Sequence, residues 1–235
     1  NQPLVEPDMT LGHAANFLYM VTGQKPSDRD ARIMDVCLIL HAEHGLNAST
    51  FTARVIGSTM ADPYSSITGA AGALTGSLHG GANEAVVAML GEIGSVENVR
   101  NYVLEKVAKK DKIMGMGHRV YKTKDPRDTI LQNLARELSK DQNNDKLLHI
   151  AEELEKVCLE LLAPKGVYPN VDFYSGLVYR KLGVQADLHT CVFAASRVSG
   201  WMAHWIEQRH GNRIYRPTQI YEGSHAQPYI PIKKR

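Results

Sequence analysis

Four short stretches of the 235-residue sequence combine reactive side chains with glycine or proline. They read LHAEHGLNAST at 40–50, GSLHGGANE at 76–84, GMGHRVYKTKDPR at 115–127 and YPNVDFYSG at 168–176. Reactive groups often lie on loops that a rigid scaffold holds in place. These stretches are therefore the first candidates for a functional site.

The first stretch carries His41 and His44, three residues apart. On a continuous helix this spacing places both side chains on one side. A His-x-x-His pair is one way to begin a metal site, but no third cysteine, histidine or carboxylate follows at a recognised spacing. Two histidines at the end of a helix, without a metal, are the more ordinary interpretation.

His79 stands among glycines, with Gly80 and Gly81 directly after it, at the expected start of a helix. Glycine lets the main chain approach a ligand, and a helix N-terminus favours a neutral imidazole and nearby anions. A neutral histidine there can donate a hydrogen bond to a developing oxyanion. The alternative is a histidine that simply occupies a turn.

The third stretch places His118 directly after a glycine-rich turn and Arg127 directly after an Asp-Pro pair. An arginine at a fixed bend can make a two-pronged contact with a carboxylate. The alternative is a solvated basic surface, which fits Arg119 and Lys124 better than it fits Arg127.

Asp172 lies between Val171 and two aromatic residues, Phe173 and Tyr174. Apolar surroundings raise the pKa of a carboxyl group, so that it can act as a base near neutral pH. Aspartate is also a common helix N-cap, and on the local sequence alone the cap is the simpler interpretation.

Two further arginines stand out. Arg197 lies within the apolar pattern FAASRVSGWMAHW, where an unpaired charge is costly. Arg216 precedes a proline in RIYRPTQIY. Together with Arg127 they give three candidate anion clamps, beside several histidines and one carboxylate. Such a set suits carbon–carbon bond chemistry on a small polycarboxylate, in which a base removes a proton next to a carbonyl and an imidazole stabilises the enol.

Helical periodicity dominates the chain, and the sequence therefore predicts an all-α fold. Asp62-Pro63 predicts a helix stop and restart. The small residues in SSITGAAGALTG permit close packing, either within the chain or between subunits. Helices are expected at 11–22, 28–43, 49–61, 63–75, 83–93, 96–109, 128–139, 146–162, 172–182 and 187–209. Loops are expected at 76–82, 111–127, 163–171 and 210–218, and an irregular arm at 228–235.

The composition argues against several classes of protein. A net charge of +2 is too small to indicate nucleic-acid binding by itself. The three cysteines are far apart and form no CxxC pair, which favours a reducing cytoplasm over a disulfide framework. No apolar run reaches membrane-spanning length, and no signal peptide is visible. The chain begins with Asn1 rather than methionine, so we expect a piece of a longer protein.

Together, HAEHGLNAST, GSLHGGANE, MGMGHRVYKTKDPR, PNVDFYSG and SRVSGWMAHW with RPTQIYEG resemble the citrate synthase family, in its shorter bacterial and archaeal form. The motifs occur in the family's order along nearly the whole chain. The resemblance implies that Asp172 removes a methyl proton of acetyl-CoA. It implies that His79 hydrogen-bonds the resulting enol and that His118 protonates the carbonyl oxygen of oxaloacetate. The implied oxaloacetate and citrate ligands are His44, Arg127, Arg197 and, in the neighbouring subunit's site, Arg216.

The resemblance also implies the rest of the reaction. Citryl-CoA is hydrolysed to citrate and free CoA, and neither a metal nor a redox cofactor is required. The glycine turn borders the adenine of CoA, and a nearby lysine reaches a phosphate. The implied CoA-binding residues are Ile113, Met114, Gly115, Lys122 and Lys165.

The family fold has a large helical domain, here 1–78 and 178–235, with a small helical domain, 79–177, inserted in it. The resemblance implies that the small domain closes over oxaloacetate and carries most of the CoA site. Family members are at least homodimers, and the helix at 63–75 would lie at the subunit interface. The family also has an N-terminal block of helices that this chain lacks.

Two alternatives stay open. A 2-methylcitrate synthase, which uses propionyl-CoA, shares the same catalytic set. Because one methylene contributes only about 1–3 kcal/mol to discrimination between acyl groups, no motif here separates the two enzymes. An inactive helical fragment of such an enzyme is the other, since the N-terminal block is absent. The complete set of His79, His118 and Asp172 argues against an inactive fragment. No nucleic-acid or membrane partner is expected.

Overall fold

The computed structural model describes residues 4–76, 79–140 and 145–235, and the chain is helical there, as the sequence predicts. These residues contain no strand, and an isolated bridge joins Met116 to Pro169. Part of the predicted loop at 76–82, residues 77–78, lies outside the described residues. The α-helices are α1 (His13–Thr22), α2 (Asp28–Ala42), α3 (Ala48–Ser58), α4 (Pro63–Leu74), α5 (Ala82–Ile93), α6 (Val99–Lys109), α7 (Pro126–Ser139), α8 (Lys146–Leu162), α9 (Asp172–Lys181) and α10 (His189–Arg209). Short 3-10 turns are η1 (Val96–Asn98), η2 (Ala163–Lys165), η3 (Ala186–Leu188) and η4 (Ile232–Lys234).

Capping side chains explain where two of the helices begin. Asp62 Oδ1 accepts a hydrogen bond from the Ser65 main-chain N–H at 3.0 Å, and Pro63 occupies the first turn of α4. The predicted break before α4 is therefore confirmed. Asp125 caps α7 in the same way, ahead of Pro126. The sequence predicted that this helix begins at residue 128. Because of this cap, α7 begins at Pro126 instead.

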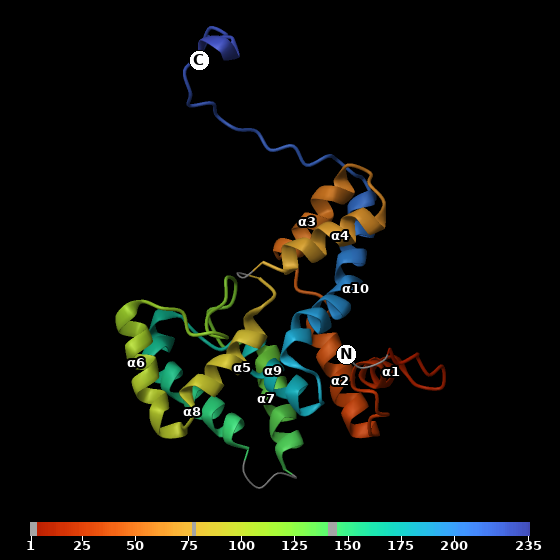
Figure 1. Ribbon diagram of the computed structural model, residues 1–235, viewed down its shortest axis with the longest axis vertical. Helices are drawn as coiled ribbons and strands as arrows, with labels where there is room; N and C mark the ends of the chain where they lie inside the picture. The colour runs from red at the N-terminus through yellow and green to blue at the C-terminus, as the bar shows by residue number, and fades with distance from the viewer. Residues whose placement is uncertain (1–3, 77–78, 141–144) are drawn as a thin grey trace.

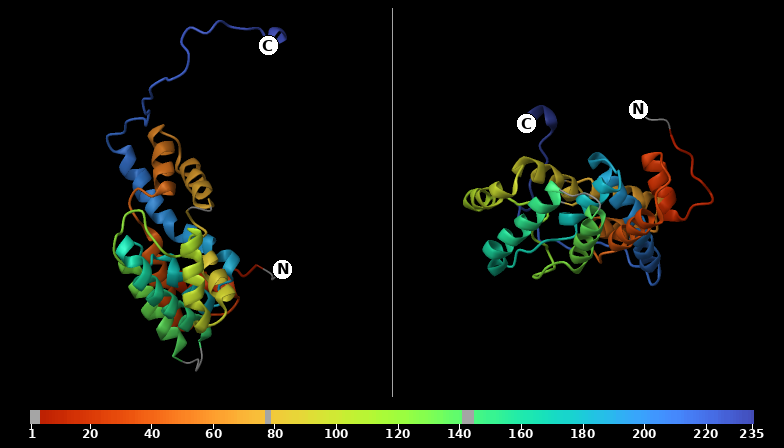
Figure 2. Two further views of the ribbon diagram at one scale, coloured as in Figure 1. Left: turned by 90° about the vertical axis from the view of Figure 1, so that its left-hand side faces the viewer. Right: turned by 90° about the horizontal axis from the view of Figure 1, so that it is seen from below.

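Figure 1 shows α5–α9 gathered into one body, with α1 and α2 beside it, while α3 and α4 extend away along the second half of α10. Figure 2 shows the same arrangement from two other sides, with the residues after α10 running away from the helices. From Arg216 to Arg235 every residue is exposed. The predicted irregular arm is therefore confirmed, apart from the short turn η4.

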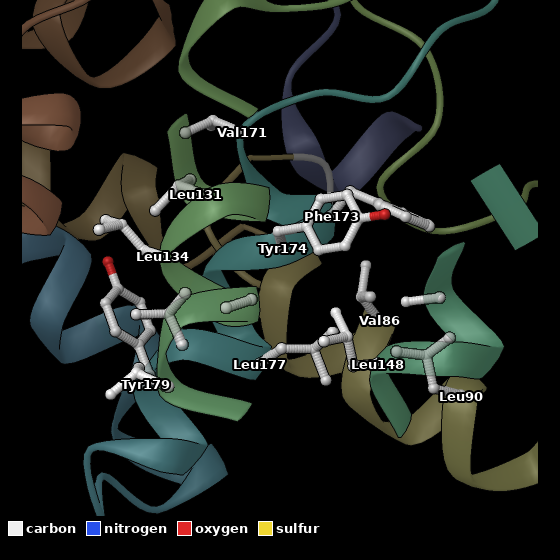
Figure 3. Close-up of a cluster of buried hydrophobic side chains, with 14 of the residues drawn as sticks. Val86, Leu90, Leu131, Leu134, Leu148, Val171, Phe173, Tyr174, Leu177 and Tyr179 are labelled. Atoms are coloured by element: carbon white, nitrogen blue, oxygen red, sulfur yellow. The ribbon is translucent and has the colours of Figure 1, made fainter. Parts of the chain in front are cut away.

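Two apolar clusters stabilise this arrangement. The larger one contains buried side chains of α1, α2 and α5–α10, and the smaller one joins α3, α4 and α10. Figure 3 shows Phe173 and Tyr174 close together in the larger cluster, with their ring centroids 5.0 Å apart. Buried aromatic side chains contribute much of the apolar area that stabilises a core. They fix the first turn of α9, and with it the position of Asp172.

The small residues of α4 serve packing within the chain at some positions. A Cβ atom at Gly69 would lie 2.2 Å from Ile56 Cδ1 of α3, and Ala70 is buried in the smaller cluster. A Cβ atom at Gly72 would meet nothing within 4 Å. Contact with α3 therefore explains part of the small-residue run. The subunit interface on this helix stays a prediction.

The middle of α10 lies directly against the end of α2. A Cβ atom at Gly200 would lie only 2.3 Å from the carbonyl oxygen of Ala42. One turn earlier, Arg197 Nε donates a hydrogen bond to the carbonyl oxygen of His41 at 2.5 Å. This contact joins the helix that carries Arg197 to the segment that leads into His44.

Lys124 does not lie on a solvated surface, as the sequence had suggested. Its ammonium group contacts the Glu155 carboxylate of α8 and lies 3.0 Å from Gln132 Oε1 and 3.3 Å from Asp128 Oδ2 of α7. Asp128 and Glu155 are both buried. Because two buried carboxylates require a cation, the lysine side chain turns inward. Arg119 is exposed, as expected.

The predicted domain division also stays a prediction. α9 continues without interruption across the expected boundary between residues 177 and 178, and the other boundary falls at residues 77–78, outside the described residues. The larger apolar cluster includes side chains from both predicted domains. In the part of the chain that the structure describes, no helix is long and apolar enough to span a bilayer.

We expect Gly200→Ala to lower the free energy of unfolding by about 1–3 kcal/mol, because the added methyl group would press on the Ala42 carbonyl and push α10 away from α2. Urea denaturation measures this change. The matched control is Gly91→Ala on α5, where a Cβ atom would meet nothing within 4 Å. Alanine there should raise stability by up to about 1 kcal/mol. Equal effects of the two substitutions would contradict the close contact.

Candidate active site

A cavity of about 840 Å³ opens between the segments that lead into α3, α5, α7 and α9 and the middle of α10. Its wall contains all but one of the residues predicted for catalysis and for oxaloacetate binding. These residues are His44, His79, His118, Arg127, Asp172 and Arg197. Residues far apart in the sequence therefore meet around a single space.

The His79 imidazole is held by the first turn of α3. Its Nε2 accepts a hydrogen bond from the Ser49 main-chain N–H at 3.3 Å and lies 2.8 Å from Ser49 Oγ. Because Nε2 is an acceptor, the proton of the neutral ring lies on Nδ1. Burial, together with the charge of Arg197, lowers the pKa of His79, so the ring is mostly neutral at pH 7. It can therefore donate a hydrogen bond through Nδ1.

The ring of His118 has the opposite tautomer. Its Nδ1 accepts hydrogen bonds from the main-chain N–H groups of Val120 at 3.0 Å and Tyr121 at 3.1 Å. The proton of the neutral ring therefore lies on Nε2. Burial lowers the pKa of His118. The ring thus presents a donor at Nε2, next to the cavity.

His44 faces His118 across a distance of 3.2 Å between their Nε2 atoms. Burial, with the positive charge of Arg127, lowers the pKa of His44 to about 4. A neutral His44 can accept the hydrogen bond that His118 donates. The ring of Tyr121 packs against both imidazoles, with centroid distances of 5.5 and 4.6 Å. This packing fixes the orientation of the pair.

Asp172 is the first residue of α9, and it does not cap the helix. Val171 occupies the N-cap position, while the Asp172 main-chain N–H donates to Asn170 Oδ1 at 3.0 Å. The simpler interpretation from the local sequence, a capping aspartate, is therefore wrong. Burial raises the pKa of the Asp172 carboxyl to about 6, although Arg127 and Arg197 act in the opposite direction. The carboxyl is thus poised as a base near neutral pH.

Arg127 makes the expected two-pronged contact, but with a carboxylate of its own chain. Its Nε and Nη2 atoms lie 3.0 and 2.7 Å from the two carboxylate oxygens of Asp125. Burial opposes ionisation of Asp125, but the Arg127 guanidinium more than offsets it and lowers the pKa of that carboxyl. Arg127 also lines the cavity, so its remaining N–H groups are available to a ligand.

Arg197 lies deep in the wall, with 2% of the residue exposed. Its guanidinium carbon is 4.6 Å from the ring centroid of Phe193, and its Nε donates to the His41 carbonyl oxygen. Burial lowers the pKa of Arg197 to about 10, which leaves it protonated at neutral pH. No carboxylate of the described residues lies within 4.0 Å of its guanidinium nitrogens. Glu43 and Asp172 partly offset the cost of burying this charge, and a bound anion would add a direct countercharge.

His41 and His44 do not share a helix face, so that expectation was wrong. α2 ends at Ala42, and Glu43 is extended with φ −147° and ψ 147°. His44 therefore turns toward the cavity, while His41 stays buried with its Nδ1 2.8 Å from the Cys37 carbonyl oxygen. Within residues 4–76, 79–140 and 145–235, no three histidine, cysteine or acidic side chains are grouped so that they could hold a metal ion.

Arg216 lies outside this cavity. It is exposed on the segment after α10, and its Nη1 donates to the Pro217 carbonyl oxygen at 3.1 Å. Figure 1 shows this segment running away from the helices. A role for Arg216 in a neighbouring subunit's site stays a prediction.

A second cavity of about 410 Å³ adjoins the first, and Gly117 lines both. It contains two of the predicted CoA residues, Ile113 and Lys165. Lys110 and Lys112 also line it. A partly apolar cavity with several ammonium groups suits a ligand that has both a flat ring and phosphates.

The other predicted CoA residues are not part of this lining. Gly115 is buried at φ 74°, and a Cβ atom there would lie 2.8 Å from side-chain atoms of both Phe173 and Val86. Glycine is therefore needed at this turn for packing. Met114 packs against the larger apolar cluster, and Lys122 is exposed.

Polar residues that hold the site were missed by the sequence analysis. Asn170 accepts a hydrogen bond from the Asp172 main-chain N–H and donates from Nδ2 to the Gly117 carbonyl oxygen at 2.8 Å, so it joins the His118 loop to Asp172. Ser49 orients His79, and its Oγ accepts from Trp201 Nε1 at 3.0 Å. Serine and asparagine are common at helix starts. The one sequence signal that could have identified Ser49 and Asn170 is their position within the stretches that contain His44 and Asp172.

Comparison with known proteins identifies the family of the chain. The family model described as citrate synthase, C-terminal domain, matches residues 1–218. The chain belongs to the citrate synthase family. It is 58% identical to the citrate synthase of Synechocystis sp. over the whole of this chain and 59% of that protein. It is 50% identical to the citrate synthase of Acidithiobacillus ferridurans, again over the whole chain and 61% of the relative.

Solved structures of citrate synthases resemble the chain over nearly its whole length. A ternary complex of the Thermoplasma acidophilum enzyme with carboxymethyl coenzyme A and oxaloacetate aligns with a TM-score of 0.91 at 39% identity, covering 97% of this chain and 61% of that one. The Thermotoga maritima enzyme aligns with a TM-score of 0.88 at 44% identity, covering 100% and 64%. The predicted family and fold class are confirmed. The chain spans about three fifths of the length of these relatives.

We expect Asp172→Asn to become more stable relative to wild type as pH rises. Because burial raises the pKa of Asp172 from 3.8 to about 6, ionising this carboxyl is less favourable in the folded than in the unfolded protein. Wild type should therefore lose up to about 3 kcal/mol of unfolding free energy between about pH 4 and about pH 6, and the variant should not. Urea unfolding of both proteins on either side of this window measures the difference. A difference independent of pH would mean that Asp172 titrates as an ordinary surface carboxyl.

Proposed function

We propose that the chain carries the catalytic centre of a citrate synthase. The reaction condenses acetyl-CoA with oxaloacetate and hydrolyses the thioester, giving citrate and CoA. One observation carries the proposal: Asp172, His79 and His118 meet Arg127 and Arg197 around one cavity. The tautomers of the two histidines and the raised pKa of the aspartate suit the steps of this reaction. Membership of the family adds independent support.

The first step needs a base and a hydrogen-bond donor on either side of the acetyl group. With a pKa of about 6, Asp172 is largely ionised at neutral pH yet more basic than a surface carboxylate. It takes a proton from the methyl group of acetyl-CoA. His79 donates through Nδ1 to the thioester oxygen and stabilises the enol as charge develops there. A neutral imidazole suffices for this role.

The second step joins the enol carbon to the ketone carbon of oxaloacetate. The ketone oxygen replaces His44 as the acceptor of the His118 Nε2 proton, and His118 donates this proton while the new carbon–carbon bond forms. Arg127 and Arg197 bind the carboxylates and hold the ketone in place. Water then attacks the citryl thioester, which releases CoA as the thiol and leaves citrate. None of these steps requires a metal or a redox cofactor.

The second cavity is the proposed CoA site. Lys165 and Lys112 place positive charge where phosphates would lie, and Ile113 offers an apolar wall. Gly117 lines both cavities, so a pantetheine arm can pass from one to the other beside it. The turn beside this site then contains Met114 and Gly115, and the exposed Lys122 lies at the outer rim of the site.

We also propose that the working form is a homodimer or a larger homo-oligomer in the cytoplasm. Arg216 lies on an exposed segment outside its own cavity, where it is available to a neighbouring copy. Large apolar side chains are exposed as well, including Tyr64 on α4 and Ile220 in the segment after α10. All three cysteines are free, in keeping with a reducing compartment.

We expect thiol release when the protein is mixed with oxaloacetate and acetyl-CoA, and slower release with propionyl-CoA. Asp172→Asn should lower turnover by about 10²–10⁴-fold, because it removes the base, and should retain oxaloacetate binding. A thiol-reactive dye follows turnover, and calorimetry follows binding. Asp187→Asn on exposed η3 is the matched control and should keep wild-type activity.

Three outcomes would overturn parts of this proposal. No thiol release from a folded sample with either substrate would contradict catalysis by this chain. Faster release with propionyl-CoA would assign the chain to 2-methylcitrate synthesis. Wild-type turnover in Asp172→Asn would remove the base from its proposed role.

A further inference from the structure

A group of polar side chains lies behind the candidate active site, between α7, α8 and α9. We call it the Lys124 cluster, and its members are Lys124, Asp128, Gln132, Glu155 and Tyr174. None of them lines either cavity, so the reaction itself does not use them. Asp128, Glu155 and Tyr174 are buried. Buried ionic groups add little to stability compared with apolar residues of similar size.

Lys124 is the centre of the Lys124 cluster. Its ammonium group contacts the Glu155 carboxylate, donates to Gln132 Oε1 at 3.0 Å and lies 3.3 Å from Asp128 Oδ2. The same group lies 5.7 Å from the ring centroid of Tyr174. Lys124 belongs to the loop before α7, so this one side chain joins that loop to three helices.

Three other members, Gln132, Glu155 and Tyr174, form a closed set of hydrogen bonds, whereas the carboxyl oxygens of Asp128 have no hydrogen-bond partner among the described residues. Tyr174 Oη donates to Glu155 Oε2 at 2.7 Å. Gln132 Nε2 donates to the same carboxylate oxygen at 2.8 Å and to Tyr174 Oη at 2.8 Å. α7, α8 and α9 are therefore held in one relative position by directional contacts as well as by packing.

The charges of the Lys124 cluster balance when Asp128 holds a proton. The charged groups that act on Asp128 or on its neighbour Tyr174 include Lys124, Asp125, Glu155, Glu152 and Arg136. Burial, reinforced by Glu155 and Asp125 against the attraction of Lys124, raises the pKa of Asp128 to about 7. Lys124 contacts Glu155, and the Asp128 carboxyl is partly protonated at neutral pH. Removal of Lys124 alone would leave two carboxyl groups buried without a cation.

Three members of the Lys124 cluster lie close in sequence to a residue of the site. Asp128 directly follows Arg127 in the first turn of α7, and Tyr174 follows Asp172 by two positions in the first turn of α9. Lys124 ends the loop that contains His118. The Lys124 cluster thus connects the three segments that present His118, Arg127 and Asp172.

We propose that Lys124 is a positioning residue, and that the Lys124 cluster fixes the His118 loop against the first turns of α7 and α9, so that His118, Arg127 and Asp172 meet in catalytic register. The expected effect of this positioning on the turnover rate rests on the proposed function. The positioning itself is a property of the folded chain and can be measured without substrate. Small displacements of catalytic groups reduce rates strongly, so a rigid set of contacts behind the site has a direct benefit.

The test compares two double variants. Lys124→Met with Glu155→Gln removes the central ion pair while keeping the charge balance, because Asp128 can stay protonated. The control, Arg100→Met with Glu160→Gln, removes an exposed pair between α6 and α8, with N–O distances of 2.9 and 2.7 Å, that touches no site segment. A third protein, Lys124→Arg, keeps the cation and tests for rescue. Thiol release and amide hydrogen exchange are measured on each protein and on wild type.

We expect exchange of the Val120 and Tyr121 amides, which bind His118 Nδ1, to accelerate about tenfold or more in the Lys124→Met/Glu155→Gln protein. Core amides of α6 serve as the internal reference and should stay as in wild type. kcat should fall about tenfold or more, with an accompanying rise in the KM for oxaloacetate. The control pair should match wild type in both readouts, and Lys124→Arg should stay within about threefold of wild type.

Unchanged exchange at Val120 and Tyr121, together with core protection like that of wild type, would overturn the proposal. So would an equal acceleration at the α6 reference amides, because the cluster would then stabilise the fold without positioning the loop. If wild type itself releases no thiol, the proposed function fails, while the exchange result still decides the positioning. If wild type is active and exchange accelerates but kcat is unchanged, the positioning has no role in catalysis and the proposal is again overturned.

Discussion

Arg197 places a guanidinium group in the middle of α10 with the His41 carbonyl oxygen and the Phe193 ring as its close partners. Among the described residues Arg197 has no direct ion pair, and Glu43 and Asp172 only partly offset the cost of burying its charge. Arg127 adds a second guanidinium in the same wall, tied to Asp125. The fold thus maintains positive charge in a cavity, and an anionic ligand is what compensates for it.

The packing of the helices around the cavity makes it possible to bury this positive charge. α10 approaches α2 at Gly200 so closely that Arg197 can use a main-chain oxygen. The same buried surroundings remove water from Asp172, which raises the pKa of that carboxyl to about 6 and makes it a base. His79 and His118 are kept neutral by burial, and main-chain N–H groups select opposite tautomers for them. One desolvated space therefore prepares both the binding groups and the reacting groups.

Much of this could be predicted from the sequence, because helical periodicity and capping are local signals. The break at Asp62 and the all-α class are examples, and the joint motifs indicated the family. The errors came from tertiary context. Lys124 was assigned to the surface because its partner Glu155 is 31 positions away, on another helix. The spacing of His41 and His44 suggested a shared helix face, but the helix ends between them, as the expected end at residue 43 already indicated. Which side of His79 or His118 carries the proton depends on contacts that appear only in the folded chain.

Calorimetric titration of oxaloacetate into the protein, beside the same titration with pyruvate, tests the central claim most directly. Pyruvate keeps the ketone and has one carboxylate fewer. If Arg127 and Arg197 hold two carboxylates, oxaloacetate should bind at one site per chain and at least about tenfold more tightly than pyruvate, a difference of about 1.4 kcal/mol or more. Equal affinities for the two acids, or no binding of oxaloacetate to the folded protein, would contradict the account.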